Sequence, residues 1–176
     1  MRSFLLINLT GGLYNMATLK IGEKQHEAKF GFAFKNLADK NYNQSDKDGN
    51  DVGGFSAIYT SLLQYDLDAL KAFWDCGLAH LKQRPSIAQI EAALEARIEV
   101  DGDTTNLFKE AFREINDSGF FKKDVKMFWK NFELFKTMGK TEEEKEENAK
   151  GVQVMLDARA ELLGEEMTDE ETELTD

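Results

Sequence analysis

The sequence predicts a mainly helical α+β domain, in which an N-terminal β-hairpin packs on a bundle of about five to six helices and an acidic C-terminal tail is disordered. Three observations predict this class. Alternating strand-like segments occur only before residue 31, and apolar residues after it recur at intervals of three and four. The 176 residues also include 13 Phe and 2 Trp, enough for a folded core.

Composition excludes several classes of protein. The formal net charge of −11 excludes a basic protein that wraps duplex nucleic acid. A single cysteine excludes a disulfide scaffold. No apolar run approaches the roughly 20 residues that a membrane-spanning helix needs. The lone Cys76 indicates a reducing compartment or indifference to redox conditions, and we expect a soluble, acidic, cytosolic domain.

Residues 1–15 are predicted to be separate from the domain. Their start resembles a short secretory signal, but the apolar stretch is too short and no small-residue cleavage site follows it. The codons of Thr10-Gly11-Gly12 can contain the purine run AGGAGG, a ribosome-binding sequence, shortly upstream of the codon of Met16. We predict Met16 as the natural start and residues 1–15 as an extension, with Met1 as the alternative.

The hairpin is predicted from two alternating segments around a glycine. Residues 18–21 and 25–30 alternate, and Gly22 lies in the turn between them. Two strands alone are marginally stable in water, so the hairpin must lie on helices. The first of these is a short helix from Phe32 to near Asn41.

A polar, glycine-rich loop is predicted at residues 43–54. It contains the opening spacing of an EF-hand, Asp46-x-Asp48-x-Asn50. The sixth position of that loop is Asp51 instead of glycine, and the twelfth is Ala57 instead of glutamate. The loop is therefore interpreted as a solvated turn.

Four apolar stripes predict the helices of the middle of the chain, at about residues 55–63, 66–81, 86–98 and 103–115. Pro85 ends the second of these helices. Asp66 and Ser86 are predicted N-caps, and Asp103 or Thr104 caps the fourth helix.

Segment 120–140 combines aromatic and basic residues. One helical stripe contains Phe121, Val125, Phe128, Phe132 and Phe135, with Trp129 near its boundary and lysines on another face. Three roles are open: packing on the core, contact with a protein partner, and binding of single-stranded nucleic acid. The separation of rings from charges argues against nucleic acid. The candidates for contact with a partner or another subunit are Phe121, Phe128, Trp129 and Phe132.

The last helix is predicted to begin at the capping box Thr141-x-x-Glu144 and to end at Leu163. Its sparse apolar stripe fits packing either on its own domain or on a neighbouring subunit. Residues 164–176 contain seven carboxylates and no basic residue, which predicts disorder. The predicted division is thus an extension 1–15, a domain 16–139, a C-terminal helix 140–163 and a tail 164–176.

No motif for catalysis, metal binding or cofactor binding is recognised. His26 and His80 have no other metal ligand at a suitable spacing. Cys76 lies on an apolar-faced helix and is expected to be a buried structural thiol. Gly53-Gly54 is not followed by the Gly-Lys-Ser/Thr of a phosphate loop. We expect no enzyme, no catalytic residues, no cofactor and no metal.

Three motifs, in this order, resemble a known family. They are Lys29-Phe30-Gly31-Phe32-Ala33-Phe34-Lys35-x-Leu37, Ala79-His80-Leu81-Lys82-x-Arg84-Pro85-Ser86 and Ser118-Gly119-Phe120-Phe121-Lys122-Lys123. The chain resembles the tail assembly chaperones of long-tailed (siphovirus-type) bacteriophages of Gram-positive hosts, from about Leu19 to Phe135.

The resemblance implies a non-enzymatic assembly factor that binds the tape-measure protein, a long helical chain that sets tail length. It would keep that protein soluble until tail-tube subunits polymerise around it, with the major tail protein as a further candidate partner. Self-association is implied too, as are action in the host cytoplasm, absence from the mature virion, and no binding to nucleic acid or membrane. Many members are also made as a second, longer product by ribosomal frameshift.

An alternative function fits the charge. Small acidic phage proteins can mimic nucleic acid and occupy the basic cleft of a host enzyme. Such mimicry needs carboxylates arrayed over a folded surface, whereas most of the acidic excess here lies in the predicted tail.

Overall fold

A computed structural model describes residues 16–165 and confirms the predicted class. A two-stranded hairpin is followed by seven helices, where the sequence predicted about five to six. The elements are β1 (Thr18–Ile21), β2 (Lys24–Glu27), α1 (Phe32–Asn41), α2 (Gly54–Leu63), α3 (Leu67–Gly77), α4 (Ile87–Asp101), α5 (Thr105–Asp117), α6 (Lys122–Phe135) and α7 (Glu142–Leu163). The predicted extension at residues 1–15 and most of the predicted tail lie outside the described residues.

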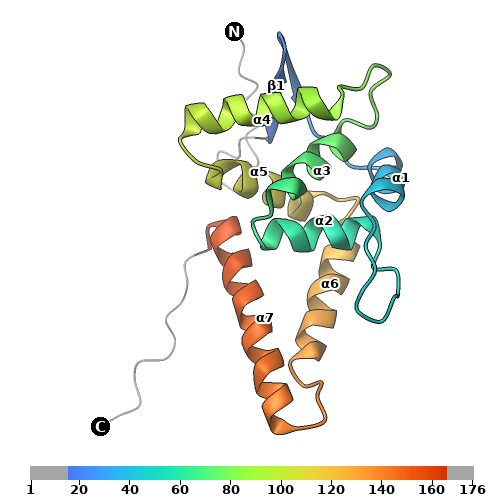
Figure 1. Ribbon diagram of the computed structural model, residues 1–176, viewed down its shortest axis with the longest axis vertical. Helices are drawn as coiled ribbons and strands as arrows, with labels where there is room; N and C mark the ends of the chain where they lie inside the picture. The colour runs from blue at the N-terminus through green and yellow to red at the C-terminus, as the bar shows by residue number, and fades with distance from the viewer. Residues whose placement is uncertain (1–15, 166–176) are drawn as a thin grey trace.

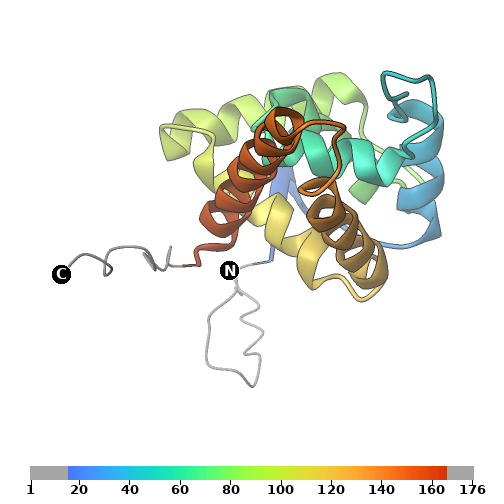
Figure 2. The same ribbon diagram turned by 90° about the horizontal axis from the view of Figure 1, so that it is seen from below.

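The molecule has a body and an arm. The hairpin and α1 to α5 form the body, with α4 lying across the end that carries the hairpin (Figure 1). Helices α6 and α7 project together from the other end of the body and are joined at their tip by residues 136–141. Figure 2 shows them side by side beneath the body. We call α6, residues 136–141 and α7 the arm.

The hairpin pairs as the alternation predicted. Its strands are antiparallel, with Thr18 opposite Glu27 and Ile21 opposite Lys24. Gly22 takes a positive φ of 61° in the turn, a conformation that favours glycine. The strand β1 contacts α4 and buries Leu19 and Ile21 in the core, so the hairpin does lie on helices.

The body is centred on α3, most of whose residues are buried. The largest fully buried side chains come from several elements, which makes one continuous core: Trp74, Tyr59, Phe34, Phe73, Phe108, Phe112 and Phe121. Cys76 is also buried, as predicted for a structural thiol, and burial raises the pKa of its thiol group.

The end of α3 corrects a prediction. The helix ends at Gly77 and not near Leu81. The backbone N–H of Lys29 donates to the carbonyl of Gly77 at 2.9 Å. A Cβ at position 77 would lie 2.8 Å from the Cβ of Ala28. The chain that leaves the hairpin therefore crosses the end of α3 at a glycine.

The predicted helix caps are largely confirmed. Asp66 accepts from the N–H of Asp68, and Ser86 forms a reciprocal capping box with Gln89. Asp103, rather than Thr104, accepts from the N–H of Thr105 at 2.9 Å.

At the start of α7, the hydroxyl of Thr141 accepts from the N–H of Glu144. The Glu144 carboxylate accepts from the N–H of Lys140 at 2.6 Å, one residue before the cap. The Thr141 bond of the predicted capping box is therefore present, and the glutamate ties down the end of the tip loop.

The loop between α1 and α2 is organised by one aspartate. The Asp46 carboxylate accepts from the backbone N–H groups of Asp48 and Asn50, both at 2.9 Å. These bonds lower the pKa of Asp46, together with a bond from the Asn50 side chain, which has the largest effect. The spacing that resembles an EF-hand thus folds as a hydrogen-bonded turn.

Candidate partner-binding surfaces

Two of the four predicted contact residues are core residues of the described structure. Phe121 is 2% exposed and Trp129 is 8% exposed. The Phe121 ring stacks on Phe55 at a centroid distance of 4.6 Å. Their burial gives these two rings a packing role.

Trp129 joins the arm to the body. Its indole N–H donates to the hydroxyl of Tyr59 at 2.9 Å, and that hydroxyl donates to Asn116 at 3.0 Å. The guanidinium of Arg159, on α7, lies 4.9 Å from the centre of the Trp129 ring. A single side chain of α6 therefore contacts α2 and α7.

The other two predicted rings are half-buried. Phe128 packs edge-on against Tyr59 at 4.8 Å, and Phe132 stacks on Phe128 at 4.9 Å. Partner contact by any of the four rings stays a prediction, and only Phe128 and Phe132 retain partial access to solvent.

The most exposed aromatic ring of the body was not among the predicted candidates. Phe32 is 73% exposed, at the first residue of α1. Its ring packs edge-on against Phe120 at 5.3 Å, and Phe120 packs edge-on against the buried Phe121 at 4.9 Å. We call Phe32 and Phe120 the aromatic pair. It presents the Phe32 ring to solvent and connects it through Phe120 to the core residue Phe121.

A signal in the sequence could have indicated this exposure. The buried residues of α1 are Phe34 and Ala38. A step of two residues turns a helix by about 200°, so Phe32 faces away from Phe34. The run of three phenylalanines conceals this reversal because every second residue is aromatic.

The arm carries further exposed apolar side chains. Those of α6 and the tip loop are Met127, Leu134, Phe135 and Met138, and α7 adds Val154. Met127 and Leu134 lie on the side of α6 opposite to the buried Val125 and Trp129.

One buried carboxylate links three segments of the body. Asp75 is the buried charged residue of the described chain. Its carboxylate accepts from the Tyr42 hydroxyl at 2.8 Å and lies 3.4 Å from the guanidinium of Arg84. Burial, and then the Asp75 carboxylate, raise the pKa of Tyr42. The cluster fastens the ends of α1 and of the α3–α4 connection to α3.

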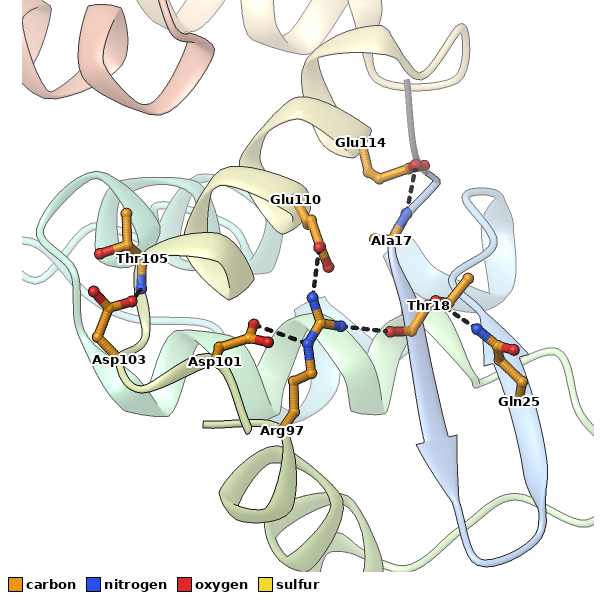
Figure 3. A network of polar contacts seen from close by, with 9 residues as sticks. All are labelled: Ala17, Thr18, Gln25, Arg97, Asp101, Asp103, Thr105, Glu110 and Glu114. Atoms are coloured by element: carbon orange, nitrogen blue, oxygen red, sulfur yellow. Dashed lines mark hydrogen bonds and ion pairs between the residues drawn. The ribbon is translucent and has the colours of Figure 1, made fainter. Parts of the chain in front are cut away.

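A second polar network holds β1 against α4 and α5 (Figure 3). The Arg97 guanidinium donates to Glu110 at 2.7 Å, to Asp101 at 2.8 Å and to the backbone carbonyl of Thr18 at 3.4 Å. One turn further along α5, Glu114 accepts from the backbone N–H of Ala17 at 2.9 Å. Both contacts are structural, because they fix the edge of the hairpin.

Within residues 16–165, no group of three or more His, Cys, Asp or Glu side chains is placed to hold a metal ion. In the same range, no helix has the length and apolar character needed to cross a bilayer.

Comparison with known families identifies the class. A family described as "Phage tail assembly chaperone protein, TAC" matches residues 18–130, from the first strand to α6. The chain belongs to this family. Its members act in the host during phage assembly, with phage tail proteins as partners, and they are generally non-enzymatic. Searches of curated proteins and of solved structures gave no match, and nothing found supports the alternative of a nucleic-acid mimic.

Proposed function

We propose that this protein binds the tape-measure protein of its phage in the host cytoplasm and keeps it soluble until the tail tube assembles around it. The major tail protein is a further candidate partner. The protein self-associates, and it leaves the particle before the mature virion forms. Its role is that of a non-enzymatic, siphovirus-type assembly factor.

The aromatic pair is the observation that carries this proposal. Aromatic side chains are enriched among the residues that dominate binding energy at protein interfaces. Phe32 exposes most of its surface while its ring rests on Phe120. Both residues lie within the range that matches the chaperone family. An apolar stripe of a long partner helix would cover these rings.

The test is co-expression of this chain with the tape-measure protein of the same phage. The substitution Phe32→Ser removes the exposed ring and should change the free energy of unfolding by no more than about 0.5 kcal/mol. Loss of one aromatic anchor should lower the affinity for the tape-measure protein about tenfold or more. The amount of tape-measure protein in the soluble fraction should decrease as the affinity falls.

Val100→Ser is the matched control, because Val100 is 83% exposed at the far end of α4. It should leave capture of the tape-measure protein unchanged. If the wild-type chain fails to capture or solubilise the tape-measure protein, the proposed function is wrong. If the Phe32→Ser variant captures it as well as the wild type does, the aromatic pair is not the contact surface.

A further inference from the structure

The outward face of α6 is basic. It carries exposed lysines around exposed apolar side chains: Lys122, Lys123, Lys126, Lys130, Met127 and Leu134. The exposed Glu133 also lies among the lysines, but it pairs with Lys136. None of these four lysines forms an ion pair with any residue of the described part of the chain. This is unusual for a chain with a net charge of −11. We call these six residues the basic face.

The outward face of α7 is acidic. The exposed Glu143, Glu147, Val154 and Glu161 lie on one side of the helix, where the exposed Lys150 is the basic exception. No ion pair of these three glutamates occurs among residues 16–165. Val154 is 65% exposed between them. We call these four residues the acidic face.

The two faces do not meet within one molecule. Lys123, Lys130, Met127 and Leu134 of the basic face lie opposite to the buried Val125 and Trp129, and its other two lysines lie at the flank of the helix. The acidic face lies opposite to the buried residues of α7, which include Val152 and Met155. Each face therefore points away from the arm, and its charges and apolar side chains remain available to another molecule.

We propose that copies of this chain associate head to tail through their arms, with the basic face of one copy seated on the acidic face of the next. Lysines then lie opposite glutamates at the rim, and Met127 and Leu134 meet Val154 at the centre. Complementary charge across an interface favours the correct partner and register. Because the two contacting faces differ, the contact is heterologous and builds a ring or an open row.

A second copy is the occupant that these observations favour, because the chain itself supplies both complementary surfaces. A nucleic acid would contact the lysines but would be repelled by the carboxylates of α7 on the same arm. This inference rests on the self-association included in the proposed function, and it adds the surface and the polarity of the contact.

The experiment uses two charge-reversed variants of the full chain. Lys123→Glu with Lys130→Glu brings the four lysine positions of the basic face from +4 to 0, and Glu143→Lys with Glu147→Lys brings the three glutamate positions of the acidic face from −3 to +1. Sedimentation velocity over a wide range of concentration measures association. The wild type should form species larger than a monomer, and added salt should weaken them. For each variant alone, the association constant should fall by about tenfold or more.

The decisive sample is the equimolar mixture of the two variants. In the mixture the two introduced glutamates of one variant can face the two introduced lysines of the other, so association should return toward the wild-type level. A variant that had merely lost its fold could not be rescued in this way. The control Lys20→Glu with Lys24→Glu removes the same charge from the hairpin and should associate as the wild type does.

Each other outcome has a defined meaning. A wild-type chain that is monomeric at all concentrations overturns both self-association and the arm contact. Variants that associate as strongly as the wild type, or a mixture that stays monomeric, overturn the arm contact alone. Neither result bears on capture of the tape-measure protein, which is measured separately through Phe32.

Discussion

Glycine at position 54 sets how closely two helices of the body approach. A Cβ built at Gly54, the first residue of α2, would lie 2.1 Å from the backbone carbonyl carbon of Ala38 in α1. Real Cβ atoms do not come so near to backbone atoms, so a larger residue would push the helices apart. The backbone N–H of Gly54 also donates to the carboxylate of Asp39 at 3.0 Å.

Gly54→Ala should therefore lower the free energy of unfolding by about 3 kcal/mol, the cost of overpacking a tight site. Urea denaturation followed by circular dichroism measures it. Gly151→Ala is the matched control, because nothing lies within 4 Å of a Cβ there and the position is inside α7. It should raise the free energy of unfolding by about 0.5–1 kcal/mol. Equal effects of the two substitutions would contradict the close approach.

Glu114 makes stability depend on pH. Burial raises the pKa of this carboxyl above its ordinary value of 4.5, and nearby carboxylates raise it further, while the bond from Ala17 opposes the shift. The folded state then binds the proton more tightly than the unfolded state does. The contribution to stability is fully present below pH 4.5 and is lost as the pH rises through the pKa of the folded state.

Glu114→Gln keeps an oxygen that can accept from Ala17 but removes the buried charge. We compare the free energy of unfolding of the variant with that of the wild type. The difference, variant minus wild type, should be larger at neutral pH than below pH 4.5. Urea denaturation across this range gives the difference. A difference that shrinks toward neutral pH would show that the Glu114 carboxylate is stabilised when folded.

At the scale of elements, the attachment of α6 depends on Trp129. Trp129→Phe keeps a ring in the site but removes the hydrogen bond to Tyr59 and weakens the contact with Arg159. The free energy of unfolding should fall by about 2 kcal/mol. Met127→Ala, on the exposed side of the same helix, should change it by no more than about 0.5 kcal/mol. Chemical denaturation compares the two, and an equal loss would mean that α6 is not held through Trp129.

The sequence predicts elements better than it predicts their ends and their exposed faces. Helix α3 ends at Gly77, but the apolar stripe in the sequence continues to Leu81. It continues because Leu78 is buried and Leu81 is half-buried, although neither belongs to the helix. Apolar spacing records burial and not backbone hydrogen bonds. The crossing of Lys29 over Gly77 is a contact between segments distant in the chain, which no local pattern contains.

The absence of long-range contacts from local sequence patterns also explains why the predicted contact residues include two buried rings. The stripe of α6 correctly separates rings from lysines, but it does not say what covers the rings. The body covers Phe121 and Trp129, while Phe32 is left exposed by its phase in a short helix. A role in binding can be read from a stripe only after the packing of the whole chain is known.

At the scale of the whole molecule, the part of the chain that matches the family includes the body but only the start of the arm. The match ends at Lys130, within α6, so most of the arm lies beyond it. The aromatic pair lies on the matched part, whereas the acidic face lies entirely on the unmatched part. Capture of a tail protein and association between copies can therefore vary separately.

The arm is fixed to the body at one end only, and this makes it a lever. Helix α7 has 22 residues and is therefore about 33 Å long. The contacts around Trp129 and Arg159 act as its pivot, close to the body. From Arg159 to Glu143 the helix rises about 24 Å, so a rotation of about 10° at that pivot would move Glu143 by about 4 Å. Small adjustments between α2 and α6 are thus converted into large displacements at Met138 and Glu143.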